Sequence, residues 1–508
     1  MQPKKVVVIG AGIGGLATAN LLAEAGYEVH VYEKDKTPGG RAGKRTIKGF
    51  TFDTGPSWYL MPDVFVHYYE LLNEPINKWL KLKKLTPAYK VFFETTKPVT
   101  ITGKLEKDSQ TFEAIEKGAG VALDQYVEKS NEIYQLSLKH FLYSNFERPL
   151  DFVRRDILRT STRLPKLLLQ PIDKYVSTFV KDQRLKQILE YPMVFLGTSP
   201  FTAPSMYSLM SALDFKEGVF YPQGGLYTII ESLVKIGKKR GVKYHYNAPV
   251  RRIMTDAGVV KGIHLESYEK VTADIVISNA DLHFTETKLL KSEDQSYPEK
   301  YWETREPGPS ALLLYLGVKG RVPELQHHNL LLVDAWKENF KAIYDKKSVP
   351  TKVSIYISKT SHTDKSVAPA GDECLIVLVP LPADISLSAK RIEKLTDHYL
   401  DQIEEMTGIA IKDRLVVKEV FKPSDFKTKF YSWQSSMLGQ SHLLKQSAFF
   451  RTPNKSKEVR NLYYVGGSTT PGIGLPMCLI GAELVYKRII GDKKGGRVST
   501  IKKMEFHS

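Results

Sequence analysis

The sequence predicts an α/β protein in which a discontinuous Rossmann-like domain accompanies an α+β domain. Three observations support this prediction. A glycine-rich strand–turn–helix unit opens the chain, strand-like sequence patterns return after a long helical stretch, and a second glycine-rich turn precedes the last helix. At 508 residues the chain exceeds the usual size of a single hydrophobic core, so at least two domains are expected.

The first unit covers residues 5–33. Residues 6–9 are short and β-branched, which is typical of a buried parallel strand. Helical spacing of apolar residues runs from Leu16 until Gly26 supplies a stop, and a second strand covers residues 28–32. This order of elements indicates a nucleotide-binding unit.

The glycines of the first turn explain its chemistry. Gly10 permits the tight turn, Gly12 lets the backbone approach a pyrophosphate, and Gly15 lets helix and strand pack closely. The phosphates then meet the positive end of the helix. Glu33 follows roughly 20 residues later, where an acidic side chain accepts hydrogen bonds from a ribose. A phosphorylated ribose would be repelled there, so FAD or NAD is expected rather than NADP. The candidate binding residues of this unit are Gly10, Gly12, Gly14, Gly15, Glu33 and Lys34.

Two further segments extend this candidate site. The glycine pair before Arg41 suits a loop that folds over the pyrophosphate with Arg41 as a cationic partner, and an ordinary turn is the alternative. Residues 49–57 read as a strand running into a turn that passes near a flavin ring, with a plain hairpin end as the alternative. The candidates added here are Gly40, Arg41, Gly55, Pro56 and Ser57.

The middle of the chain changes character. Residues 86–219 carry aromatic and leucine-rich helical patterns, and residues 148–189 combine many arginines and lysines with apolar residues. Such helices bind anionic membrane surfaces, while a core-facing helix with solvated basic flanks is equally compatible.

Strands return after residue 219. Residues 273–280 read as a further buried parallel strand, and backbone groups near Val250 are placed to contact adenine. Residues 286–424 suggest an antiparallel sheet with helices. His327 and His328 are expected to be surface residues of a polar turn rather than metal ligands, because adjacent side chains point to different faces and a third ligand is missing. No metal site is therefore predicted.

The last informative stretch is residues 461–476, in which a strand and a glycine-rich turn precede a helix that opens with proline. The turn is expected to anchor the other end of a long cofactor through Gly467, Gly472, Ile473 and Gly474. The domain division that follows assigns residues 1–85, 220–285 and 425–492 to the cofactor and residues 86–219 and 286–424 to the substrate and membrane. Residues 493–508 form a basic tail, and fraying is expected from Gly491 onward.

The composition limits the kinds of binding partner and the cellular location that can be expected. The formal net charge of +17 favours a polyanionic surface, and the absence of zinc spacings or RNA-binding signatures favours anionic lipid over nucleic acid. Cys374 and Cys478 are the two cysteines, far apart and in apolar elements, so no disulfide is expected. The expected location is the cytoplasm, peripherally associated with a membrane. No pattern indicates an oligomeric state.

Taken together, these motifs resemble those of the phytoene desaturase family of bacterial and fungal type, flavin-dependent carotenoid desaturases of the amine-oxidase-like flavoprotein superfamily. Thr470 and Ile473 stand where a histidine and a small residue are common in that family, which leaves subfamily and substrate open. The resemblance rests on residues 10–15, 38–42, 49–56, 221–225 and 461–476.

The resemblance implies non-covalent FAD and a long-chain polyene hydrocarbon substrate taken from the membrane. The implied activity is the dehydrogenation of phytoene or a related carotenoid precursor. The alternatives are a redox-neutral carotene isomerase and another amine-oxidase-like FAD oxidoreductase. Asp156, Arg159 and Thr160 match an Asp-x-x-Arg-Thr cluster found in family members, which makes them candidate catalytic residues; an i,i+3 surface ion pair is the alternative.

Overall fold

The computed structural model describes residues 3–145, 164–447 and 450–503. The catalytic candidates Asp156, Arg159 and Thr160 lie outside the described residues, as does the first part of the basic segment.

A five-stranded parallel sheet lies at the centre of the first domain. Its strand order is β19-β13-β1-β2-β9, so strands from three distant parts of the chain pair side by side. Val7 of β1 is paired with His30 on one side and Val276 on the other. The discontinuous α/β arrangement that the sequence predicts is confirmed. The strands are β1 (Lys5–Ile9), β2 (Glu28–Tyr32), β9 (Lys243–His245), β13 (Ile275–Ser278) and β19 (Leu462–Tyr464).

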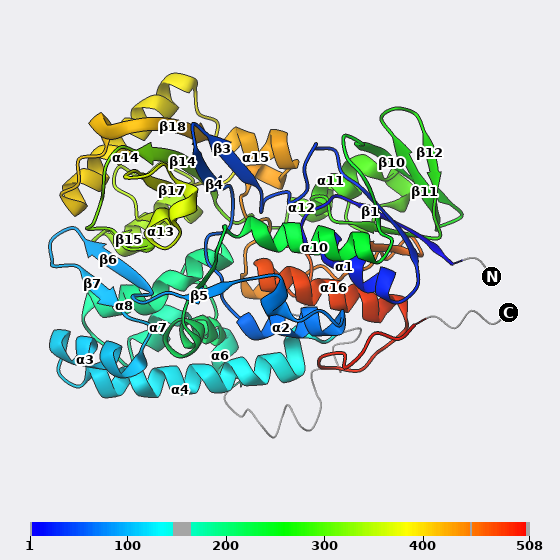
Figure 1. Ribbon diagram of the computed structural model, residues 1–508. Coiled ribbons are helices and arrows are strands. Elements are labelled where there is room, and N and C mark those ends of the chain that lie inside the picture. Colours follow the sequence, from blue (N-terminus) through cyan, green and yellow to red (C-terminus); the bar gives the residue numbers. More distant parts are fainter. Residues whose placement is uncertain (1–2, 146–163, 448–449, 504–508) are drawn as a thin grey trace.

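Both faces of this sheet are covered. Val6 and Val8 pack under three helices that lie together in Figure 1, whereas Val7 and Ile9 pack toward an antiparallel three-stranded sheet. Helix α1 begins at Ile13, three residues before the predicted start, because Gly14 and Gly15 belong to its first turn. The covering elements are α1 (Ile13–Glu24), α10 (Tyr227–Lys239) and α16 (Leu475–Ile489), and β10 (Val250–Asp256), β11 (Val259–Leu265) and β12 (Lys270–Thr272).

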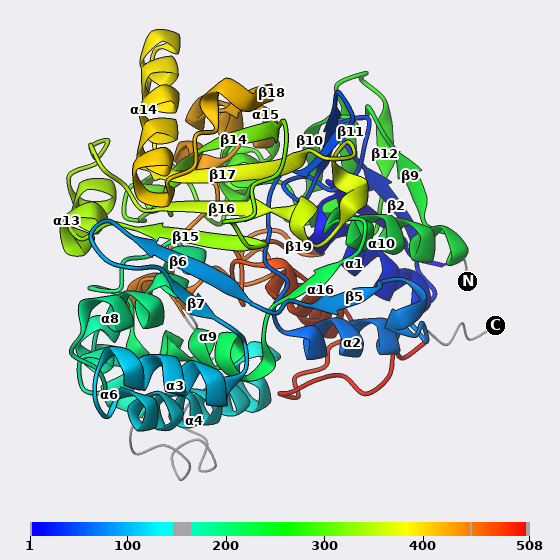
Figure 2. The ribbon, with the colours of Figure 1, turned by 60° about the vertical axis from the view of Figure 1, so that its left-hand side comes forward.

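A seven-stranded sheet forms the core of the second domain. Its order is β18-β14-β17-β16-β15-β6-β7, and all its pairs are antiparallel except β15–β6 (Figure 2). Alternate residues of β14 face helix α14 (Ala389–Thr407) and the hairpin formed by β3 (Lys44–Ile47) and β4 (Phe50–Asp53). The strands are β6 (Tyr89–Phe93), β7 (Val99–Ile101), β14 (Ser310–Val318), β15 (His328–Leu332), β16 (Ile355–Lys359), β17 (Glu373–Leu381) and β18 (Leu415–Phe421).

A helical layer lies beneath this sheet in Figure 2. The helical patterns that the sequence shows in residues 86–219 do not describe the whole segment, because β6 and β7 at its start extend the large sheet. β5 (Leu82–Lys84) and β8 (Phe220–Pro222) pair where the chain enters and leaves this layer. The helices of the segment are α3 (Leu105–Ile115), α4 (Ala119–Ser137), α6 (Leu164–Leu169), α7 (Ile172–Val176), α8 (Gln183–Glu190) and α9 (Leu209–Ala212). The remaining helices are α2 (Pro62–Leu71), α11 (Leu282–Phe284), α12 (Glu299–Trp302), α13 (Trp336–Phe340) and α15 (Pro423–Phe430).

The fraying expected after Gly491 does not occur in residues 491–503. The Lys487 ammonium, 1% exposed, donates hydrogen bonds to the carbonyls of Tyr143 and Gly496, both at 2.9 Å. The backbone N–H of Lys502 donates to the Tyr486 hydroxyl at 2.7 Å. The buried ammonium of Lys487 therefore ties residues 491–503, the C-terminal strap, to α16. The basic composition alone did not indicate this contact.

The histidine pair is also placed differently from the prediction. His327 and His328 are 1% and 0% exposed, because His328 begins a strand in the interior of the large sheet and stacks on Trp58 at 4.1 Å between ring centroids. Among the described residues no group of three metal-ligating side chains is found. Within those same ranges no helix has the length and apolar character needed to cross a bilayer.

Candidate active site

A cavity of about 1020 Å³ lies between the two domains, at the ends of β1, β13 and β19. One end is formed by the glycine-rich turns that follow β1 and β19, and the rest by the helical layer and the large sheet. Of the predicted cofactor residues, those on its wall are Gly10, Gly12, Gly14, Glu33, Lys34, Gly40, Arg41, Gly55, Pro56, Ser57, Val250, Gly467, Ile473 and Gly474. Gly15 and Gly472 do not line it.

The first turn requires glycine at more than one position. Gly10 has φ +92°, and a Cβ on Gly15 would lie 2.3 Å from the Gly10 carbonyl oxygen, as close helix–strand packing predicts. A Cβ on Gly12 would lie 2.7 Å from Oδ1 of Asn279. The Asn279 amide donates to the Val465 carbonyl at 2.8 Å and so joins the ends of β13 and β19. Sequence reasoning missed Asn279, although its place after a buried strand was a usable signal.

Glu33 is held rigidly at the end of β2. Its two carboxylate oxygens accept hydrogen bonds from the N–H groups of Ala11 at 2.7 Å and Asp35 at 2.9 Å. Burial raises the pKa of this carboxyl, and the two N–H groups oppose that rise. Each oxygen keeps a second lone pair, so the carboxylate can also accept hydrogen bonds from ribose hydroxyls. Lys34, in contrast, is paired with Asp35 at 2.9 Å.

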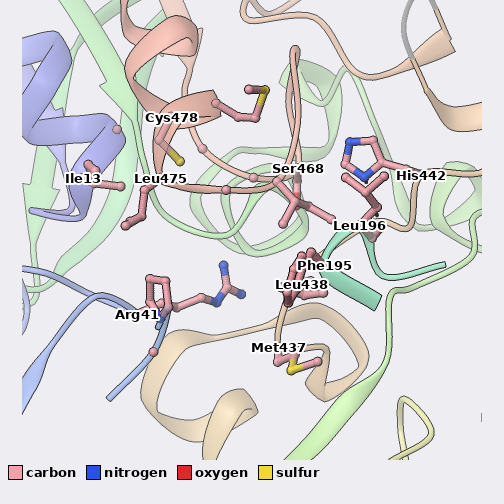
Figure 3. A pocket seen from close by; sticks show the side chains of 18 of the residues that line it. Ile13, Arg41, Phe195, Leu196, Met437, Leu438, His442, Ser468, Leu475 and Cys478 are labelled. Atoms are coloured by element: carbon pink, nitrogen blue, oxygen red, sulfur yellow. Dashed lines mark hydrogen bonds between the residues drawn. The ribbon is translucent and has the colours of Figure 1, made fainter. Parts of the chain in front are cut away.

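The Arg41 loop lies directly on the first turn. The N–H of Gly39 donates to the Ala11 carbonyl at 2.8 Å, and the Arg41 guanidinium donates through Nη2 to the Ser432 hydroxyl at 2.6 Å. Arg41 Nε is buried and has no hydrogen-bond partner in the part of the chain that is described. Figure 3 shows the guanidinium extending into the pocket. A buried donor beside the uncapped N-terminus of α1 fits a phosphate group.

The second turn has the same character. Helix α16 begins after Gly474 without a side-chain cap, so its first N–H groups are available to a ligand. Gly472 has φ +146°, and a Cβ there would lie 2.2 Å from Nε2 of His442. Two uncapped helix ends and one arginine on a single cavity fit a dinucleotide that spans both turns.

The rest of the cavity is mostly apolar. All the Asp, Glu, Lys and Arg side chains on its described wall belong to the dinucleotide end: Glu33, Lys34, Asp35, Arg41, Asp281 and Lys429. The apolar end is lined mainly by Phe195, Leu196, Met206, Leu209, Met210, Leu213, Leu330, Leu332, Trp336, Phe340 and Ile343.

His442 lines the cavity where the apolar chamber meets the second glycine-rich turn (Figure 3). Nδ1 lies 3.2 Å from the Leu196 carbonyl and must donate to it, because a carbonyl only accepts. Burial, and then the charge of Arg451, hold the pKa of His442 well below its ordinary value. His442 is therefore neutral at pH 7, and no sequence signal singled it out.

Asp53 stabilises the start of a helix. Its carboxylate accepts hydrogen bonds from the N–H groups of Leu226 at 2.9 Å and Tyr227 at 3.1 Å, which caps the start of α10. Asp53 does not line the described cavity.

Residues 13–485 match the family of flavin containing amine oxidoreductases. The chain belongs to this family. It is an FAD-dependent oxidoreductase, and the flavoprotein resemblance drawn from the motifs is confirmed.

Relatives within the family are similar over almost the whole chain. The carotenoid 3,4-desaturase of Haloarcula japonica is 36% identical, over 97% of this chain and 99% of the relative. The zeta-carotene-forming phytoene desaturase of Myxococcus xanthus is 34% identical, over 96% and 94%. An oxidoreductase structure from Methanosarcina mazei, 18% identical with a TM-score of 0.60, covers 95% of this chain and 100% of its own and has the same fold.

Proposed function

We propose that this protein is an FAD-dependent desaturase that dehydrogenates phytoene or a related carotenoid precursor and so extends its polyene. The observation that carries the proposal is one continuous cavity, in which a mostly apolar, aromatic-lined chamber opens onto the dinucleotide end. A site for an amine or a porphyrin would need aromatic or charged handles. The chamber offers aromatic side chains but no charged one on its described wall, which suits a hydrocarbon. The desaturase names of the relatives agree with this proposal.

Bound FAD supplies the acceptor for a hydride. The chain contributes a dry chamber, since apolar side chains exclude water and hold a long hydrocarbon in line. Loss of a hydride from one carbon and a proton from its neighbour forms the double bond. We propose that Asp156 stabilises the positive charge or takes the proton, with Arg159 and Thr160 orienting it.

The domain division is proposed on the same basis. Residues 1–85, 220–285 and 425–492 hold FAD through Gly10, Gly12, Gly14, Gly15, Glu33, Lys34, Gly40, Arg41, Gly55, Pro56, Ser57, Val250, Gly467, Gly472, Ile473 and Gly474. Residues 86–219 and 286–424 form the substrate chamber.

Expression in cells that accumulate phytoene tests the activity. New longer-wavelength polyene bands are expected in the extracted pigments. An unchanged chromophore length with a cis-to-trans shift would instead identify an isomerase, and unaltered phytoene in the presence of FAD-loaded protein would contradict the proposal. An Asp156→Asn variant that keeps FAD and full turnover would remove Asp156 from the reaction.

We also propose peripheral attachment to an anionic membrane surface near α6. Leu168 lines the cavity, and the next residue, Leu169, is 75% exposed. Phe450 is on the cavity wall and 59% exposed. Helices α7 and α8, in contrast, bury Ile172 and Leu185, so the apolar residues of the basic segment do not share one role.

Flotation with anionic vesicles at low salt tests this attachment. Leu169→Glu is expected to lower the bound fraction, because an exposed leucine is replaced by a charge. Val121→Glu is the matched control, since Val121 is 62% exposed on α4 and does not line the described cavity. Equal loss in the two variants, or no flotation of the unaltered protein, would contradict attachment at α6.

A further inference from the structure

Arg451 is a buried cation held entirely by backbone carbonyls. Its side chain is 2% exposed. Nε donates to the Thr469 carbonyl at 3.1 Å, Nη1 to that of Gln446 at 3.3 Å, and Nη2 to that of Gln440 at 3.2 Å and also to that of Gly467. No carboxylate within the described ranges forms an ion pair with it or alters its pKa. Its charge is therefore not neutralised locally.

This guanidinium contacts the second glycine-rich turn from the side that faces away from the cavity. Gly467, Ser468 and Thr469 line the cavity, and Arg451 binds two of their carbonyls from the protein side. The C=O and N–H of a trans peptide point in opposite directions. Holding the Gly467 carbonyl therefore turns the Ser468 N–H toward the cavity, where Figure 3 places Ser468.

We propose that Arg451 is a positioning residue for FAD, which orients the Gly467–Ser468 peptide toward the flavin end of the cofactor and raises the reduction potential through its buried charge. The inference rests on the proposal that this end of FAD lies against the turn at residues 466–474. A cofactor that accepts a hydride gains negative charge, and a nearby positive charge in a medium of low dielectric constant favours that form.

The field of Arg451 reaches other groups on the cavity wall. Its charge contributes to the lowered pKa of His442 and opposes the rise in the pKa of Tyr207, both of which line the chamber. Burial lowers the pKa of Arg451 itself to about 10, so the guanidinium remains charged at pH 7. These effects agree with a permanent charge beside the reacting region.

Two measurements on the full-length protein test the proposal: the flavin midpoint potential by spectroelectrochemistry, and FAD affinity by fluorescence titration. Arg451→Gln removes the charge and is expected to lower the ratio of reduced to oxidised cofactor at a fixed potential at least tenfold, about 30 mV for a two-electron couple. Arg451→Lys keeps the charge but not the planar fork of donors, so FAD is expected to bind at least tenfold more weakly with the potential largely retained.

Lys487→Met is the matched control. Lys487 is also a buried cation held by carbonyls, but it lies about 20 Å along α16 from Gly474. This variant is expected to leave both the potential and FAD affinity unchanged.

An unchanged potential in Arg451→Gln would overturn the proposal. If that variant does not fold, wild-type FAD affinity in Arg451→Lys would overturn it, and a tenfold loss that Lys487→Met does not show would support it. Neither readout depends on a carotenoid, so failure of the pigment assay and failure of this inference are distinguishable.

Discussion

The close packing of Gly55 against the Arg41 backbone predicts a measurable effect of the substitution Gly55→Ala. A Cβ on Gly55 would lie 1.9 Å from the Arg41 carbonyl oxygen and 2.9 Å from its carbonyl carbon. Both atoms belong to the backbone, so no side chain can rotate away. Reaching 3.0 Å, the shortest tolerable separation, requires the two loops to part by about 1.1 Å.

Two costs follow for Gly55→Ala. Overpacking of this kind costs about 1–3 kcal/mol of folding free energy. Displacement of Arg41 would also weaken the charge-assisted hydrogen bond that we propose it donates to the cofactor. Such a bond is worth about 1.5–3 kcal/mol, which corresponds to FAD binding roughly 10-fold to 150-fold more weakly. The assay is titration of the apoprotein with FAD, followed by flavin fluorescence, together with a thermal melt.

Gly481→Ala is the control for Gly55→Ala. A Cβ on Gly481 would meet its nearest neighbours at 3.5 Å, an ordinary van der Waals contact, and alanine is favoured over glycine within a helix such as α16. This variant should be neutral or slightly stabilising. If Gly55→Ala binds FAD within threefold of the unaltered protein and melts at the same temperature, the steric argument for the Arg41 loop is refuted.

Three further predictions concern single buried groups. Glu33→Gln leaves the N–H of either Ala11 or Asp35 facing an amide NH₂, so FAD affinity should fall by about 10-fold or more in the same titration; equal affinity would remove Glu33 from the site. Burial raises the pKa of Glu190 to about 8 from an ordinary value of 4.5, so its contribution to stability is present below pH 4.5 and is lost as the pH rises through 8. Glu190→Gln keeps an acceptor for the indole N–H of Trp336 and should raise the melting temperature more at pH 9 than at pH 5. An equal gain in melting temperature at the two pH values would contradict a raised pKa for Glu190. Lys487→Met should speed limited proteolysis of residues 491–503, because three carbonyls lose their shared donor, and an unchanged cleavage rate would show that the strap is held otherwise.

Local sequence patterns predicted the elements around the first turn well. The strand at residues 5–9, the acidic end of β2 and the second glycine-rich turn were each visible, since their chemistry resides in neighbouring residues. Glycines with positive φ or with a backbone atom in the place of a Cβ, such as Gly10 and Gly15, can be identified from motif spacing alone.

The sequence-based predictions that were wrong concern contacts between distant segments. His327 and His328 read as a polar turn because their burial depends on β6 and β16, which lie far away in sequence. Residues 491–503 read as a free tail because the carbonyls that hold Lys487 are brought together only by folding.

By itself the sequence predicted that a dinucleotide binds and which turns would hold it, because those turns are built from consecutive residues. The tertiary structure alone decided that both turns share one cavity and that its far wall is mostly apolar. It also decided that Asn279 and His442 line this cavity and that Arg451 lies behind the second turn. The physical reason is that backbone conformation is a local property of a few residues. Burial, and the electrostatic field of a buried charge, depend on every segment that packs around it.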